Sequence, residues 1–240
     1  RAATLEAQTT QPIQDHIEMG FSGENGDLSF NDLITKLEDI PYYSVLFSNA
    51  FGTEAISEDR IQRALAQFVR SIQSFDSKYD EGRSLTANNN QPFPNFSALE
   101  NTGKQLFNQP PVFNNTGMRI NGGVGCAGCH QAPEFDIDPN SRNNGVIGTI
   151  SGTETDLTNT RAPSLRDVVK QNGDTNGGFM HNGAFVELID VINHYNVIDG
   201  TGNNNLDPRL RPGGNPQQLN MTPNEKNALV TFMETLSGAD

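Results

Sequence analysis

Apolar residues recur along the chain at the three- and four-residue spacing that is typical of amphipathic helices. No segment alternates between apolar and polar residues for long enough to favour a β-sheet, so the pattern predicts an all-α protein. In the first third of the chain it predicts helices over residues 28–40, ended by Pro41, and 45–52. A stronger helix opens at Ser57, and one stripe of it carries Ile61, Leu65, Phe68, Ile72 and Phe75.

Two further predicted helices have explicit start signals. Ser97 and Glu100 form a capping box, in which each side chain accepts a backbone N–H of the other's residue. Thr222 and Glu225 repeat the pattern before the last helix, with Pro223 at the first helical position, where its missing N–H costs nothing.

The remaining segments suggest a division into two domains. Residues 82–95 ("GRSLTANNNQPFPN") are polar and contain prolines, so they predict a linker. Further along, residues 162–170 and 184–196 are predicted helices, and residues 131–160 are predicted to be mostly loop. The two predicted domains are residues 1–85 and residues 86–240.

The 240-residue chain carries a formal net charge of −13 at pH 7. A surface of that sign repels nucleic acid and acidic lipid, and it steers basic partners towards the protein. No apolar run is long enough to cross a bilayer. We therefore expect neither nucleic-acid binding nor a membrane span.

Both cysteines of the chain lie in one Cys-x-x-Cys-His motif, formed by Cys126, Cys129 and His130. A thioredoxin-type dithiol would follow a strand, but the preceding residues are typical of a loop. A zinc site needs two more ligands, and a disulfide across two residues is strained. Covalent haem c uses all three side chains, because two thioethers hold the porphyrin and the histidine binds the iron as its proximal ligand.

Haem c is therefore the preferred interpretation of the motif. Its spacing suits one helical turn, which brings both sulfurs and the imidazole to one face. A helix before the motif, loops after it and a terminal helix together predict a class I cytochrome c-like haem domain with long loops. Covalent haem c is normally completed outside the cytoplasm, so we expect an exported, periplasmic protein.

Six stretches of the chain resemble, in the same order, bacterial di-haem cytochrome c peroxidases and related enzymes of the methylamine-dehydrogenase-maturing (MauG) type. They are "RAATLEAQTTQPIQDHIEMG", "DIPYYSVLFSNAFG", "IQRALAQFVRSIQSFDSKYD", "ENTGKQLF" with "CAGCH", "TRAPSLRDVVK" and "FMHNGAFVELIDVINHYN". The resemblance implies that residues 1–85 are a helical remnant, the latter part of a peroxidatic cytochrome c-like domain. Residues 86–240 would then be the second haem domain.

Members of this family carry two Cys-x-x-Cys-His motifs, whereas this sequence has one. The first haem of the family would be attached upstream of Arg1. Either that part lies outside this sequence, or the protein works with one haem c.

The resemblance also implies catalytic residues for the peroxidatic haem. Gln8 and Glu18 match a glutamine and a glutamate that project over that haem in the family. A carboxylate there takes a proton from peroxide and returns it to the departing oxygen. The alternative is that Glu18 is one acidic residue of a solvated surface.

The second iron ligand of the haem at Cys126 and Cys129 has two candidates. The family's methionine ligand corresponds to Tyr195 here, and MauG-type enzymes place a ligating tyrosine at this point. Met180 could offer a thioether instead, leaving Tyr195 to pack on the porphyrin. Met233 lies on the apolar stripe of the last helix and is predicted to pack there.

The family also binds a calcium ion through backbone carbonyls, and the matching positions are Asn176 and Gly178. This sequence departs there, since "GDTNGGFMH" replaces a proline-containing segment. Arg161 and Arg166 could pair with haem propionates or lie on a helix surface.

The resemblance implies reduction of hydrogen peroxide, with electrons from a small donor protein, a cytochrome or a cupredoxin, relayed through the haem of the Cys-x-x-Cys-His motif. Two alternatives stay open. One is a MauG-type enzyme that oxidises residues of a partner protein, and the other is a mono-haem electron-transfer cytochrome. The resemblance is also compatible with a homodimer.

Overall fold

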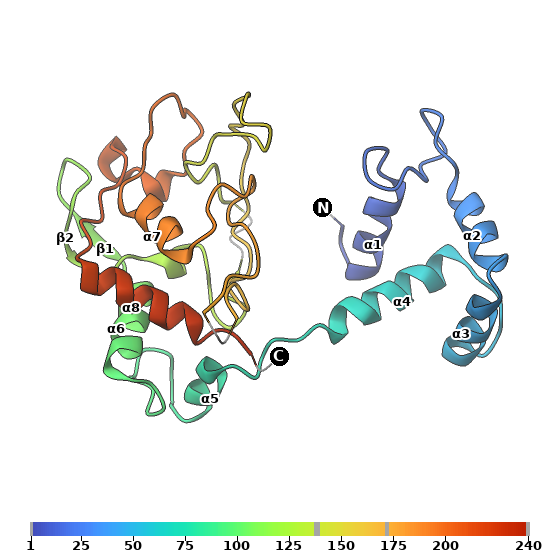
Figure 1. Cartoon of the computed structure of the whole chain (residues 1–240), viewed down its shortest axis with the longest axis horizontal. Coiled ribbons are helices and arrows are strands. Elements are labelled where there is room, and N and C mark those ends of the chain that lie inside the picture. The colour runs from blue at the N-terminus through green and yellow to red at the C-terminus, as the bar shows by residue number, and fades with distance from the viewer. Residues whose placement is uncertain (1, 137–139, 171–172, 239–240) are drawn as a thin grey trace. The chain divides into compact units, whose positions relative to one another are not determined.

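The structure is a computed structural model that describes residues 2–136, 140–170 and 173–238. It forms two compact units, Arg1–Gln73 and Ser74–Asp240, which are described separately below. Both units are predominantly helical (Figure 1), as the apolar spacing predicts.

The first unit contains four helices: α1 (Leu5–Gln14), α2 (Phe30–Glu38), α3 (Pro41–Phe51) and α4 (Glu58–Ser71). Ser57 caps α4 as predicted, and Pro41 both follows α2 and begins α3. The helix α4 packs on α1, to which it is tied by an ion pair of 2.7 Å between Arg70 and Glu6. A small apolar core fills the unit, made of Ile13, Phe30, Phe47, Ile56 and Ile61.

The predicted stripe of α4 is only partly buried. Ile61 joins the core, but Phe68 is 65% exposed and Ile72 is 66% exposed. The helix also ends at Ser71, so that Ile72 and Phe75 lie beyond it. The helical spacing identified Ile61 on the apolar face of α4, and this residue is buried. The other buried residue of the helix is Ala66, which the pattern did not single out.

The second unit contains the elements α5 (Lys78–Ser84), α6 (Ala98–Asn108), β1 (Pro111–Phe113), β2 (Arg119–Gly122), η1 (Cys126–Gly128), α7 (Leu188–Asn196), η2 (Pro208–Leu210), η3 (Pro212–Gly214) and α8 (Pro223–Glu234). Both predicted capping boxes are formed, Ser97 with Glu100 and Thr222 with Glu225. The helices α6 and α8 cross in close contact, and a Cβ on Gly103 would lie only 1.9 Å from Ala228 O. Glycine is therefore required at this crossing.

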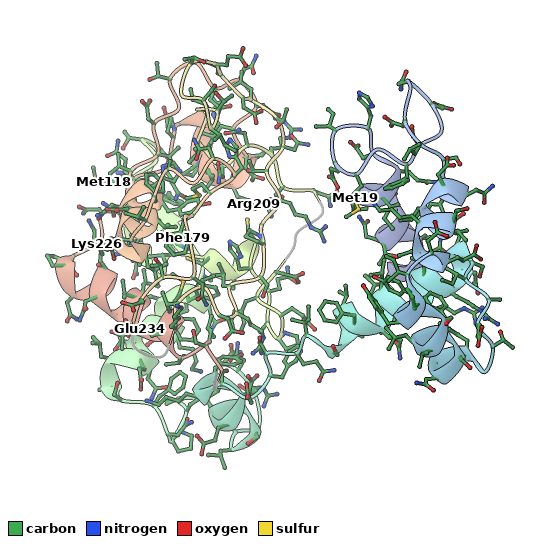
Figure 2. All side chains as sticks on the ribbon, turned by 45° about the vertical axis from the view of Figure 1, so that its right-hand side comes forward. Met19, Met118, Phe179, Arg209, Lys226 and Glu234 are labelled. Carbon is green, nitrogen blue, oxygen red and sulfur yellow. The ribbon has the colours of Figure 1, made fainter. Side chains whose placement is uncertain are left out.

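Edge-to-face and tilted aromatic contacts fill the core beneath this crossing, made by Tyr79, Phe93, Phe96, Phe107, Phe135 and Phe232. Phe179, labelled in Figure 2, packs against the same core from the loop before α7. Met233 is 7% exposed within it, which agrees with the predicted packing role.

The structure divides the chain twelve residues before the predicted boundary at residues 85/86 (85 − 73 = 12). The segment 82–95 is not a linker, because Phe93 is 1% exposed and packs on Tyr79 of α5. Lys104 of α6 secures the same segment by donating to Asn89 O and Gln91 O, both at 2.6 Å. The linker prediction rested on the polar residues and prolines of this segment. The packing of Phe93 instead makes the segment part of the second unit.

One further helix prediction was wrong, and one small element was missed. Residues 162–170 form no helix; their backbone bonds instead to distant loops, as Leu165 N–H does to Phe135 O at 3.3 Å. The strands β1 and β2 form an antiparallel hairpin that an all-α prediction misses, because three and four residues are too few to show alternation. The loop prediction for residues 131–160 is confirmed in its described part, and residues 137–139 lie outside the described residues.

Candidate haem site

The Cys-x-x-Cys-His motif begins on η1, and the segment before it, predicted to be a loop, contains the short strand β2. The chain approaches it along the end of α6, where Val124 N–H donates to Leu106 O at 2.8 Å. A Cβ on Gly123 would lie 2.5 Å from Leu106 O, so only glycine fits this approach. Gly125 then turns the chain with a left-handed φ of 74°.

The motif itself is a tight turn. The amides of Cys129 and His130 both donate to Cys126 O, at 3.1 and 2.9 Å. Arg209, labelled in Figure 2, supports the turn. Its Nη1 donates to Gly128 O at 3.0 Å, and its guanidinium forms a fork with Asp207 at 2.8 and 2.7 Å. The predicted helical turn is thus present as a short 3₁₀ turn.

The imidazole of His130 is oriented by two backbone carbonyls. Its Nδ1 lies 3.1 Å from Phe135 O and 3.0 Å from Pro163 O. Since carbonyls only accept, Nδ1 carries the proton and Nε2 keeps a lone pair. Burial also lowers the pKa of His130, which favours the neutral ring. A neutral imidazole with Nδ1 held by the backbone and Nε2 available is the form that ligates a metal.

Cys126 lies in apolar surroundings. Its side chain packs against the aromatic core of the second unit. Burial first, and then the neighbouring Cys129, raise the pKa of the Cys126 thiol to about 12. A thiolate ligand for zinc is disfavoured at such a site, whereas a neutral thioether suits it. The set of donors therefore fits covalently attached haem c.

Tyr195 lies on α7 and is brought towards the motif. Its phenol is close enough to Cys126 and Cys129 to interact electrostatically with both thiols. Burial raises the pKa of Tyr195, and a hydrogen bond with the side chain of Asn144 opposes that rise. The structure thus brings together three side chains from the motif and one from α7, which the sequence had separated by 65 residues (195 − 130 = 65).

Met180 is linked to the same amide. Asn144 Nδ2 lies 3.3 Å from Met180 Sδ, and Met180 has a left-handed φ of 67°. Both candidates for the second ligand therefore meet at Asn144, which our sequence analysis did not single out. The sequence "NNG" at residues 143–145 predicts a turn, but it does not indicate which side chains Asn144 contacts.

Gln8 and Glu18 lie in the first unit. Gln8 is on α1, Glu18 is in the turn that follows it, and both are exposed. The amide of Glu18 donates to Asp15 O at 3.2 Å, which shapes this turn. Their predicted catalytic roles stay predictions.

The two positions matched to a calcium ion, Asn176 and Gly178, are exposed in the loop before α7. The Asn176 side chain donates to Asp167 O at 2.5 Å. Among the described residues, no group of three or more His, Cys, Asp and Glu side chains could hold a metal ion. A calcium ion bound by backbone carbonyls stays a prediction.

Arg166 is engaged elsewhere than at a haem propionate. Its guanidinium forms a fork with Asp80 of α5, with both bonds at 2.8 Å, and also donates to Pro133 O and Ser74 O. Its side chain is 6% exposed. Arg166 therefore ties the loop after the motif to α5, whereas Arg161 is exposed.

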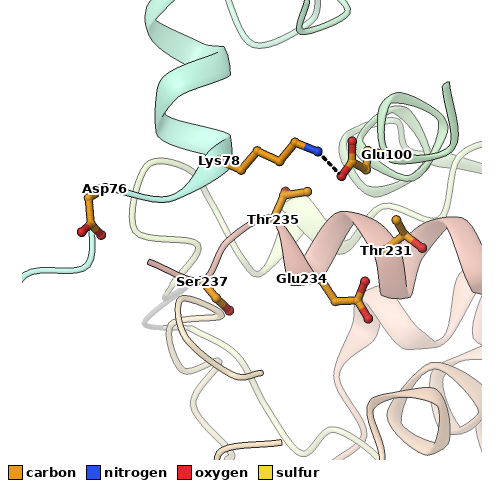
Figure 3. A pocket seen from close by; sticks show the side chains of 7 residues that line it. All are labelled: Asp76, Lys78, Glu100, Thr231, Glu234, Thr235 and Ser237. Atoms are coloured by element: carbon orange, nitrogen blue, oxygen red, sulfur yellow. Dashed lines mark hydrogen bonds and ion pairs between the residues drawn. The ribbon is translucent and has the colours of Figure 1, made fainter. Parts of the chain in front are cut away.

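A separate pocket lies among α5, α6 and α8 (Figure 3). Lys78 and Glu100 form an ion pair of 2.6 Å across it, and Glu234 lies on its α8 side. None of the predicted site residues lines this pocket. In the part of the chain that the structure describes, no helix is long and apolar enough to span a membrane.

Comparisons with known proteins show which proteins the chain is similar to. A family model described as di-haem cytochrome c peroxidase matches residues 1–88. The chain is 29% identical to methylamine utilization protein MauG of Methylophilus methylotrophus, over 99% of the chain and 62% of that protein. It is 23% identical to cytochrome c551 peroxidase of Nitrosomonas europaea, over 99% of the chain and 60% of that protein.

A solved structure shares the fold. The crystal structure of a MauG-like protein associated with microbial copper homeostasis matches with a TM-score of 0.61 at 24% identity, over 98% of this chain and 69% of that chain. This chain therefore spans about three fifths of the length of the relatives it matches in sequence.

The family match begins in the first unit, and the sequence similarity continues through the cysteine motif to the end of the second. The chain is thus similar to di-haem cytochrome c peroxidases and to MauG along nearly its whole length.

Proposed function

We propose that this protein is a periplasmic haem c oxidoreductase that reduces hydrogen peroxide with electrons relayed through a haem at Cys126 and Cys129. The observation that carries the proposal is the geometry of His130, whose Nδ1 is held by two backbone carbonyls so that Nε2 can bind iron. The relatives named MauG and cytochrome c peroxidase, aligned over 99% of the chain, support it.

The overall reaction consumes one hydrogen peroxide, two electrons and two protons, and it yields two waters. A small donor protein supplies the electrons, and the net charge of −13 favours one with a basic face. When bound, the haem supplies the redox chemistry. Cys126 and Cys129 would tether this group and His130 would bind its iron, while Glu18 would move the proton between the peroxide oxygens at the peroxidatic haem that the resemblance implies.

The domain assignment belongs to the same proposal. Residues before the second unit would be the latter part of a peroxidatic domain, and the second unit would be the electron-relaying haem domain. The partial coverage of the relatives, 62% and 60%, is consistent with a first haem domain that this sequence does not include.

A haem count on the natural exported protein, together with a peroxide assay, tests this proposal. We expect two haems per chain by the pyridine haemochrome method, and oxidation of two equivalents of a reduced one-electron donor protein per peroxide. One haem per chain and no peroxide turnover would contradict the proposal and favour a mono-haem electron carrier.

The position of Tyr195 favours a second candidate, a MauG-type enzyme that oxidises residues of a partner protein. A phenolate ligand stabilises ferric and higher states of the iron, whereas a methionine sulfur stabilises the ferrous state. Axial ligands move haem potentials over a range of about 0.8 V, so the two candidates differ strongly. Tyr195 lies within electrostatic reach of both cysteines, as a ligand opposite His130 would.

Replacing Tyr195 by phenylalanine distinguishes these candidates. With Tyr195 as ligand, the ferric wild type should lack the sulfur-to-iron absorption band in the far red, and Tyr195→Phe should raise the midpoint potential and leave the sixth position open or water-filled. Absorption spectra and a redox titration measure both effects. A wild type that shows the sulfur band, lost only in Met180→Ala, would assign the ligand to Met180 and favour the peroxidase.

A further inference from the structure

One side-chain amide contacts both candidates for the second haem ligand. Asn144 Nδ2 donates towards Met180 Sδ at 3.3 Å, and the Asn144 side chain lies close enough to the phenol of Tyr195 to counter the rise in its pKa by hydrogen bonding. An amide nitrogen carries two hydrogens, so it can hold an oxygen and a sulfur at the same time.

The direction of this amide is fixed. Its Oδ1 accepts from Val146 N–H at 3.1 Å. If the amide were flipped, a donor would face that N–H and the carbonyl oxygen would face the sulfur, which would break both interactions. The NH₂ group therefore points towards Met180 and Tyr195.

The backbone beneath Asn144 is anchored on both sides. His194, the neighbour of Tyr195 on α7, places its Nε2 2.9 Å from Asn144 O. Asn143 is fully buried, accepts from Gly145 N–H at 2.9 Å and from Asn203 Nδ2 at 2.8 Å, and donates to loop carbonyls. These bonds fix the backbone at Asn143 and Asn144 relative to α7 and to the neighbouring loops, and so they fix the base of the Asn144 side chain.

A donor in this position affects the two candidates differently. A phenolate oxygen has enough lone pairs to accept a hydrogen bond and bind iron at once, and the donor stabilises its charge. A thioether sulfur is a weak acceptor, and the contact with Asn144 Nδ2 engages one of its two lone pairs and fixes the position of Met180 Sδ.

We propose that Asn144 is a positioning residue that selects the second axial ligand, holding Tyr195 in place to bind the iron and holding Met180 away from it. This inference rests on the proposed haem at Cys126 and Cys129. It concerns ligand choice, so it can fail while the proposed function stands.

Two variants of Asn144 test the inference on the haem-loaded protein. Asn144→Ala removes the donor and shortens the side chain. Asn144→Asp keeps the shape and the acceptor for Val146 N–H but replaces the NH₂ with an oxygen. We expect both variants to lose the phenolate-type ferric spectrum and to show a raised midpoint potential, with the sulfur-to-iron band appearing in Asn144→Ala. That band should disappear in the double variant Asn144→Ala/Met180→Ala.

Asn205→Ala is the matched control. Its amide donates to Leu157 O at 2.8 Å in the same group of loops, away from both candidate ligands, so its loss reports on loop stability alone. We expect it to leave the spectrum unchanged. If Asn144→Ala does not fold, Asn144→Asp decides alone.

Three results would overturn the inference. The first is a spectrum and potential in the Asn144 variants equal to wild type at equal haem content, and the second is a sulfur band already present in the wild type. The third is a control that changes as much as the Asn144 variants. A wild-type protein without covalent haem would instead overturn the proposed function, and the haem content measured in each sample separates these cases.

Discussion

Replacing Cys126 and Cys129 together by alanine is expected to abolish covalent haem attachment. Each sulfur forms one thioether, and no other cysteine in the chain can replace it. Because a covalent tether is removed, the loss should be complete and should not depend on marginal folding energies. Haem staining after denaturing electrophoresis measures it, together with the intact mass of the chain.

Gly128→Ala is the control for this experiment. Gly128 lies between the two cysteines, and a Cβ there would meet nothing within 4 Å, so alanine fits the turn. We expect Gly128→Ala to keep its haem. Tightly bound zinc without porphyrin in the wild-type protein would contradict the haem assignment.

Replacing Glu18 by glutamine is expected to lower peroxide turnover about a hundredfold or more in the proposed two-haem form of the protein, which is the usual scale for losing a positioned acid-base group. Glutamine keeps the shape of the side chain but cannot accept and return the proton. Stopped-flow mixing of the reduced protein with peroxide measures this step. Electron transfer from the donor to the second haem should be unchanged, because Glu18 belongs to the first unit.

Glu24→Gln removes the same charge from the next loop and is the matched control. Glu24 is exposed, and nothing in its position assigns it a catalytic role. We expect wild-type turnover from it. Equal turnover in Glu18→Gln and Glu24→Gln would make Glu18 an ordinary residue of the acidic surface.

Features that depend on neighbouring residues could be predicted from the sequence. The capping boxes at Ser97 and Thr222 are local patterns, and both form as expected. The haem motif is local too, within five residues. The prediction of Met233 as a core residue followed from helical spacing and is confirmed by its burial.

Features that depend on distant contacts could not be predicted in this way. The segment 82–95 looks like a linker until Phe93 is seen to pack on Tyr79. Residues 162–170 have helical spacing, but Arg166 is drawn to Asp80 of α5, 86 residues earlier. Asn144 carries no signal of its own, because its partners Met180 and Tyr195 come from loops and helices that only the fold brings near.

The crossing of α6 and α8 at Gly103 also orders the assembly of the second unit in time. Its two contacting residues are 125 positions apart (228 − 103 = 125), so this contact cannot form until nearly the whole unit has been synthesised. Contacts between such distant residues form slowly, because a long loop must close first. The cysteine motif emerges about a hundred residues earlier than α8 (223 − 126 = 97). If haem is attached as proposed above, the motif would be accessible to the attachment machinery for the interval before α8 arrives and packs against α6.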